Sequence, residues 1–227
     1  MKRRITLGGW VGLALLAAMS LWAADYGTRL SARSGSKMRM EGTSSVHDWQ
    51  VESKLIGGFI EAGKNFPTEP GQEVKPGPVE ARAEAFVTVR SLQSLNKDGS
   101  HYSDGMDEVM WDKLKMKEHA RIVFQSSELI LKEMPKSKDA PYLFEAKGRL
   151  SVAGVTNTIS MPINVLPLGD KKLKITGTTT VKMTAFGIDP PAPKIALGAI
   201  KTGDEVKLLL EWMLGPVKPP AAPAAGK

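Results

Sequence analysis

The chain has 227 residues, and its 31 Lys and Arg residues against 24 Asp and Glu residues give a formal net charge of +7 at pH 7. Hydrophobic residues make up 42% and charged residues 24%, which is the balance of a globular protein rather than a disordered one. The absence of cysteine excludes a disulfide scaffold, a thiolate metal site, a cysteine nucleophile and a lipidated N-terminal cysteine.

The first segment has the anatomy of a secretory signal peptide. The cationic run from Lys2 to Arg4 precedes an uncharged, mostly apolar stretch over residues 5–24 that ends in small residues suited to cleavage. An uncleaved membrane anchor is the alternative, because the stretch approaches the length that spans a bilayer. Gly8 and Gly12 weaken that alternative. We expect a cleaved signal peptide at 1–24, a periplasmic or secreted protein, and no stable membrane insertion.

The positive charge of the remaining chain is small. Residues 1–24 hold three positive charges and no negative one, so their removal leaves a formal net charge of +4. That charge is low for a nucleic-acid-binding domain, and no Lys/Arg cluster alternates with aromatic residues, so we expect no nucleic-acid partner. An inward-facing arginine could meet an anionic lipid headgroup, although alternation favours a solvated position for Arg82. The arginines in or beside predicted strands are Arg39, Arg82, Arg90 and Arg149.

An alternation of apolar and polar residues predicts antiparallel strands with one apolar face. Residues 143–166 predict a hairpin, because the turn-like stretch 153–156 separates two alternating runs. Many strands joined by turns indicate either a sandwich or a closed barrel, and periodicity leaves both open. The segments with this pattern are 79–89, 121–131, 143–152, 159–165, 173–183 and 205–214.

One segment has helical spacing instead. It predicts a short amphipathic helix near residues 104–118, with Ser103 or Asp104 at its start and lysines toward its end. We expect its methionine-rich stripe to be the buried face; contact with a ligand is the alternative, since methionine adapts to varied apolar shapes. The apolar residues at this spacing are Met106, Val109, Met110 and Leu114.

The loops and the tail complete one domain. Residues 63–78 hold four prolines and three glycines, which predicts an exposed connection. The Pro/Ala-rich residues 215–227 predict a flexible tail. No linker separates two cores, so residues 25–39 form a lead-in and residues 40–214 form the single domain.

The sequence offers little for catalysis or metal binding. His47, His101 and His119 lack the spacing of metal ligands, and we expect neither a metal site nor a cofactor. His47 and Asp48 lie near two serines, which raises a hydrolase as a hypothesis, but no nucleophile elbow or zinc-protease motif is present. We expect local hydrogen bonds for these two residues and no enzymatic activity.

Several motifs in order resemble the YceI-like family, and the resemblance covers about residues 40–214. It implies an all-β protein, a single extended antiparallel β-barrel of lipocalin-like type, with the short helix near one end of the barrel. Members of the family are periplasmic or secreted, enclose a long apolar tunnel for polyisoprenoid or related amphiphilic lipids, and often form dimers. The motifs are residues 42–49 (GTSSVHDW), 87–92 (VTVRSL), the helical residues with His119, 121–124 (RIVF), 148–156 (GRLSVAGVT), 184–188 (TAFGI) and 198–206 (GAIKTGDEV).

The resemblance and the strand pattern together predict a non-catalytic protein that binds or carries an amphiphilic, polyisoprenoid lipid, with a homodimer left open. A periplasmic protein–protein accessory or stress-response module with a filled core is the alternative, and a hydrolase that uses His47 is a third hypothesis. The residues expected to line the apolar lumen share a strand face with other apolar residues. They are Val87, Val89, Ile122, Phe124, Phe144, Leu150, Val152, Ile159, Met161 and Ile163.

Overall fold

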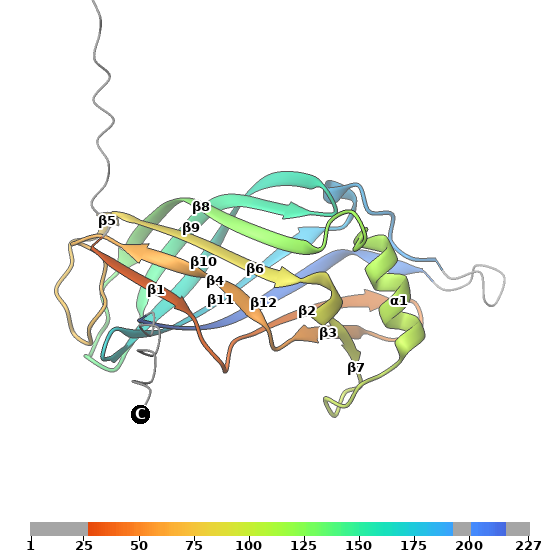
Figure 1. Ribbon diagram of the computed structural model, residues 1–227, viewed down its shortest axis with the longest axis horizontal. Coiled ribbons are helices and arrows are strands. Elements are labelled where there is room, and N and C mark those ends of the chain that lie inside the picture. Colours follow the sequence, from red (N-terminus) through yellow and green to blue (C-terminus); the bar gives the residue numbers. More distant parts are fainter. Residues whose placement is uncertain (1–26, 193–200, 217–227) are drawn as a thin grey trace, which may run out of the picture.

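Long antiparallel strands dominate the computed structural model, which describes residues 27–192 and 201–216 (Figure 1). The predicted signal peptide and the tail beyond residue 216 lie outside the described residues. The elements are β1 (Thr28–Ala32), β2 (Lys37–Ser44), β3 (Trp49–Ser53), β4 (Ile56–Ala62), β5 (Gly77–Pro78), β6 (Ala81–Thr88), the 3-10 helix η1 (Val89–Ser91), β7 (Gln93–Leu95), α1 (Asp104–Lys113), β8 (Arg121–Glu133), β9 (Tyr142–Val152), β10 (Val155–Gly169), β11 (Lys172–Lys182), the 3-10 helix η2 (Thr184–Phe186) and β12 (Thr202–Pro216).

Eight of these strands form a closed barrel. The pairing runs β1-β4-β6-β8-β9-β10-β11-β12, and β1 pairs with β12 to close the circle. The fold is therefore a closed barrel and not a sandwich, the two architectures that the strand pattern left open. A sheet that closes on itself has no free edge around the circle, which is one way in which β-proteins avoid edge-to-edge association.

Three further strands extend the sheet beyond the barrel. β2 pairs with β12, β3 with β2, and β7 with β3. Between β1 and β2, the hydroxyl of the buried Ser36 accepts a hydrogen bond from the main-chain N–H of Met213 (3.0 Å) and donates one to the carbonyl of Arg33 (2.8 Å). At the end of β3, Ser53 Oγ lies 2.7 Å from the Oγ of Ser91 in η1. Serine hydroxyls therefore satisfy buried polar groups where the strand ladders break.

The predicted hairpin is present as β9 and β10, with eleven paired positions. Ala153 and Gly154 have φ of 50° and 86°, the pair of left-handed conformations that a two-residue type I′ turn requires. The predicted strands 121–131, 173–183 and 205–214 correspond to β8, β11 and β12. The strand predicted over 79–89 is shorter, because Val89 begins η1.

The helix is shorter than the predicted 104–118. It ends in a Schellman motif, in which the main-chain N–H groups of Lys115 and Met116 donate to the carbonyls of Asp112 and Trp111, both at 2.9 Å. Lys115 takes the left-handed φ of 51° at the position after the helix cap. This conformation ends the helix before residues 115–118 can join it.

The predicted buried face of the helix is wrong in part. Met106 and Val109 are 43% and 44% exposed, whereas Asp107 is 1% exposed. Met110 and Leu114 do pack against the core. The face is rotated because the carboxylate of Asp107 has buried hydrogen-bond donors to meet, as described below. Within the described residues, no helix has the length and apolar character needed to cross a membrane.

The loop over residues 63–78 is exposed at most positions, as predicted, but part of it is buried. Phe66 is 1% exposed and Val74 is 9% exposed, and both belong to the core. Figure 1 shows this loop at the end of the barrel opposite α1. The prolines and glycines turn the chain across that end, so that an aromatic side chain enters the barrel instead of solvent.

Candidate functional site

The inward side chains of the barrel enclose an apolar cavity of about 30 Å³. A void of this size holds about one water-sized molecule, so it forms only part of any site for a long chain. Hydrocarbon, thioether and aromatic groups make up the lining. It consists of Ile60, Phe66, Ala83, Ala85, Phe124, Leu129, Phe144, Ala146, Met161, Ile163, Val165, Ile175, Leu210 and Trp212.

The inward faces change along the barrel from buried to partly exposed. On β12, Leu214 and Trp212 are 1% and 3% exposed, whereas Leu210 is partly exposed. On β10, Met161 is buried and Ile159 is partly exposed. The partly exposed half is the one nearer α1. On β9, however, Leu150 and Val152 toward the same end are buried, so the inward faces at the α1 end are partly exposed in only part of the barrel wall, which includes β10 and β12.

The opposite end is closed by the loop over residues 63–78. The rings of Phe66 and Phe144 pack with their centroids 5.7 Å apart. The hydroxyl of Tyr142 donates a hydrogen bond to the carbonyl of Gln72 at 2.5 Å, and burial raises the pKa of Tyr142 above its ordinary value. The loop therefore fills this end of the barrel.

The structure places the ten predicted lumen residues in or beside the apolar interior. Phe124, Phe144, Met161 and Ile163 come together around the cavity. The remaining six do not line the cavity: Val87, Val89, Leu150 and Val152 are buried in the core, and Ile122 and Ile159 are partly exposed and pack against it. Contact of any of the ten with a ligand stays a prediction.

Sequence reasoning missed Trp212, which lines the cavity from β12. The signal was available, because Trp212 shares its strand face with Leu210 and Leu214 in the predicted strand. Among the described residues, its indole Nε1 is the one buried side-chain nitrogen or oxygen that has no hydrogen-bond partner.

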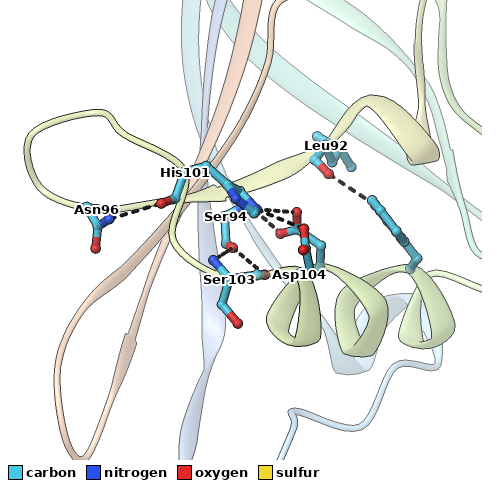
Figure 2. Close-up of polar contacts among 8 residues, drawn as sticks. Leu92, Ser94, Asn96, His101, Ser103 and Asp104 are labelled. Carbon is cyan, nitrogen blue, oxygen red and sulfur yellow. Dashed lines mark hydrogen bonds and ion pairs between the residues drawn. The ribbon is translucent and has the colours of Figure 1, made fainter.

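Polar contacts anchor α1 beside β7 (Figure 2). The main-chain N–H of Ser94 donates to Asp107 Oδ1 at 2.6 Å, and His101 Nε2 lies 2.9 Å from Asp107 Oδ2. One turn later, Trp111 Nε1 donates to the carbonyl of Leu92 at 3.0 Å. These bonds explain why an aspartate, rather than Met106, occupies the buried face of the helix.

The same anchor brings together three groups of the kind that bind metals. Ligand atoms of His101, Asp104 and Asp107 all lie within 4.8 Å of one another. Both carboxylate oxygens of Asp107 already have protein partners, and Asp104 Oδ1 lies 3.8 Å from the His101 ring at the surface. These contacts attach α1 to β7 and to the segment that carries His101, and this attachment accounts for the cluster. The three histidines of the sequence lie apart, since His47 contacts Tyr102 and His119 lies against Gly154.

His47 has the local role that its sequence context predicts. It is exposed, and its Nδ1 lies 2.9 Å from the carbonyl oxygen of Asp48. The hydroxyl of Ser44 donates to the carbonyl of His47 and not to its ring. The arrangement lacks the serine-to-imidazole contact on which a hydrolytic triad depends.

The four candidate arginines have partners on the outside of the barrel. Arg39 pairs with Glu52 at 2.8 Å and Arg82 with Glu61 at 2.5 Å. Arg90 stacks on the ring of Trp111, 4.3 Å from its centroid, and Arg149 donates to Gln125 at 3.1 Å. None of the four lines the apolar cavity. Among the described residues, the lining of this cavity therefore offers no cation to an anionic headgroup.

Comparison with known proteins connects this barrel to one family. A family model described as the YceI-like domain matches residues 34–213. The comparison with curated proteins found no match.

Two solved structures share the fold. BcnA from Burkholderia cenocepacia is 16% identical with a TM-score of 0.55, and the match covers 78% of this chain and 95% of that one. A polyisoprenoid binding domain from Saccharophagus degradans, implicated in plant cell wall breakdown, is 10% identical with a TM-score of 0.59, and the match covers 83% of this chain and 98% of that one. At these identities the likeness establishes a common barrel.

Proposed function

Because this chain belongs to the YceI-like family, we propose that it is a non-catalytic protein that binds or carries an amphiphilic lipid of polyisoprenoid type in the lumen of its barrel. The observation that carries the proposal is the continuous apolar face that leads from the cavity to the partly exposed inward residues of β10 and β12. The polyisoprenoid binding domain from Saccharophagus degradans supports the choice of ligand class, since its barrel is similar.

Burial of hydrocarbon would supply the affinity. Removal of apolar area from water contributes about 25 cal/mol per Å², or ~0.8 kcal/mol for each buried methylene group. A branched chain of fifteen or twenty carbons could therefore bind tightly with few polar contacts. The enclosed cavity is too small for such a chain, so the lipid must also occupy the lumen toward α1, where Leu210 and Ile159 are partly exposed.

We place this binding outside the cytoplasm. The support is the predicted signal peptide over residues 1–24, with its cationic start and apolar stretch. Cell fractionation and the mass of the mature N-terminus test this part. A protein that stays in the cytoplasm with residues 1–24 intact would contradict the localisation and leave the binding proposal to be judged separately.

Native mass spectrometry followed by solvent extraction tests the binding itself. Protein produced from the whole chain in a bacterium with a periplasm is expected to carry one isoprenoid or related lipid per barrel. Delipidated protein should take up geranylgeraniol from solution. Protein that is empty when isolated and also fails to take up geranylgeraniol would overturn the proposal.

A periplasmic protein–protein accessory with a filled core is the second candidate. It is favoured by the small volume of the enclosed cavity and by exposed apolar residues near α1, among them Tyr102, Met106 and Val109. This candidate predicts no lipid in the isolated protein and no uptake. The same mass-spectrometric measurement therefore separates the two functions.

A further inference from the structure

β10 and β11 are paired over only part of their length. The ladder between them ends at Ile163 opposite Gly177. Toward the α1 end, β10 continues over residues 155–162 in pairing with β9, and β11 continues over residues 178–182 in pairing with β12. Among the described residues, the facing edges of these two segments have no strand partner. They form an unpaired interval in the wall of the closed barrel.

Two residues of the sequence account for the point at which the ladder ends. Pro162 comes directly before Ile163 and has no main-chain N–H, so it cannot donate to a continued ladder. Gly177 has no side chain, and a Cβ atom there would lie 2.8 Å from Ile163 Cγ2 and 3.2 Å from Met161 Sδ. Side chains of β10 therefore pack over the main chain of β11 at Gly177, and strand pairing does not continue beyond it.

The burial of the inward side chains changes at the same point. Where the two strands are paired, Ile163 and Ile175 are 7% and 3% exposed. Beyond the last pair, Ile159 on β10 and Val181 on β11 are partly exposed, although both pack against the core. Solvent therefore reaches apolar inward side chains on both sides of the unpaired interval.

The 3-10 helix η2 covers this interval, since it lies against both β10 and β11. Phe186 and Ile188 are 3% and 8% exposed and belong to the hydrophobic core. The side-chain amide of Asn157 on β10 donates a hydrogen bond to the carbonyl of Ala185 at 2.7 Å. Residues 184–188 thus form an apolar plug that joins the two strands where their own pairing is missing.

The plug is attached through polar side-chain contacts. The main-chain N–H and the hydroxyl of Thr184 donate to the carboxylate of Asp204 on β12, at 2.9 and 2.7 Å, and these bonds lower the pKa of Asp204 below its ordinary value. Gly187 follows η2 with a φ of 67°, a conformation that glycine adopts at little cost. Displacement of the plug would uncover the inward face and break no pairing between barrel strands.

We propose that residues 184–188 are a gate over a lateral opening between β10 and β11, through which a lipid enters and leaves the lumen. This inference rests on the proposed function and describes how access to its site is controlled. The opening suits a hydrocarbon chain, because Phe186 and Ile188 cover it and Ile159 and Val181 flank it. Loop segments that gate a site in this way typically move without loss of the surrounding fold.

A reversible cross-link tests the gate, because the chain has no cysteine of its own. Asn157→Cys with Ala185→Cys places one thiol on β10 and one on η2, and a short bis-methanethiosulfonate joins them. Exchange of bound geranylgeraniol for its deuterated form, followed by native mass spectrometry, should slow at least about tenfold on cross-linking and recover on reduction. The control is Thr180→Cys with Lys207→Cys, which joins positions of β11 and β12 that are already paired and should leave exchange unchanged.

A second variant loosens the gate instead of locking it. Asp204→Ala removes the acceptor of Thr184 and should speed both uptake and release about fivefold, whereas the exposed neighbour Glu205→Ala should match wild type. If the cysteine pair prevents folding, the comparison of these two variants decides.

Exchange that cross-linking does not slow, or that is equal in Asp204→Ala and Glu205→Ala, would overturn the gate. Lipid binding would remain, and a route past α1 would be favoured. Failure of wild type and every variant to take up geranylgeraniol would instead remove the proposed function.

Discussion

Asp107 Oδ1 lies 2.6 Å from the main-chain nitrogen of Ser94, a contact that joins the first turn of α1 to the strand β7. The second carboxylate oxygen contacts His101. Both oxygens of Asp107, the one buried residue within α1, therefore have a hydrogen-bond partner. This contact explains the orientation of the helix better than its hydrophobic residues do.

Replacement of Asp107 by alanine should detach α1 from β7. Loss of a buried charged acceptor with two partners is expected to lower the free energy of unfolding by about 2–3 kcal/mol, measured by urea denaturation. The amide of Ser94 should also exchange faster with deuterium. Asp104→Ala, at a side chain that is 96% exposed, should change stability by less than about 0.5 kcal/mol. Equal effects of the two variants would contradict the anchor.

The lumen can be blocked by one substitution on β11. Thr179 follows the inward face of Leu173 and Ile175 and pairs with Leu208 of β12, whereas Thr178 and Thr180 are exposed. Thr179→Phe should reduce uptake of geranylgeraniol at least about tenfold, because the ring occupies the volume that the chain needs. Thr178→Phe places the same ring outside and should leave uptake unchanged. Similar uptake by both variants would move the site away from this part of the barrel.

The loop over residues 63–78 should contribute strongly to stability. Phe66→Ala removes a ring that packs on Phe144 and is expected to cost about 3–5 kcal/mol. Val46→Ala, at a residue that is 63% exposed, serves as the control and should change stability by less than about 0.5 kcal/mol. Chemical denaturation gives both values. A negligible effect of Phe66→Ala would restore the loop to the exposed connection that its prolines predicted.

The contributions of Ser53 and Ser91 to stability should be energetically coupled, because their hydroxyls are in contact. Ser53→Ala leaves the hydroxyl of Ser91 with one partner fewer and removes an acceptor for the main-chain N–H of Leu55, so it should cost about 1–2 kcal/mol. In a double-mutant cycle with Ser91→Ala, the two losses should sum to more than the double variant loses. Strict additivity would indicate that the 2.7 Å contact contributes nothing.

Acid should weaken the outer face formed by β1, β4 and β6. A hydrogen bond from Arg82, assisted by the charges of Arg82 and Arg29, lowers the pKa of Glu61 below its ordinary value. A depressed folded-state pKa means that the stabilisation is present above the unfolded pKa and is lost as the pH falls through the folded pKa. Stability measured below about pH 4 should therefore decline less steeply in Glu61→Gln than in wild type. The exposed Glu118→Gln should follow the wild-type curve.

The period-two pattern predicted the strands and the β9–β10 hairpin because it reports which face of each strand is buried. It did not report the closure between β1 and β12, since pairing between distant strands leaves no local signature. The buried face of the helix was predicted wrongly because hydrophobicity favours burial of Met106 over burial of Asp107. In the structure, the buried main-chain N–H of Ser94 on β7 binds the carboxylate of Asp107, so the aspartate is the buried residue. Trp212 was overlooked although it shares a strand face with Leu210 and Leu214; its position in the cavity lining depends on the closure of the barrel.

The two ends of the barrel differ in the contacts that stabilise them, and this difference affects the rate at which a bound lipid would enter and leave. Among the described strands, β7 pairs only with β3, and α1 lies against it through side-chain contacts. We expect that a guest departing past α1 would need those contacts to break but no pairing between strands of the barrel. Its residence time would then depend on the attachment of a single helix, and mutation of that attachment could tune the rate without breaking any strand pairing of the barrel.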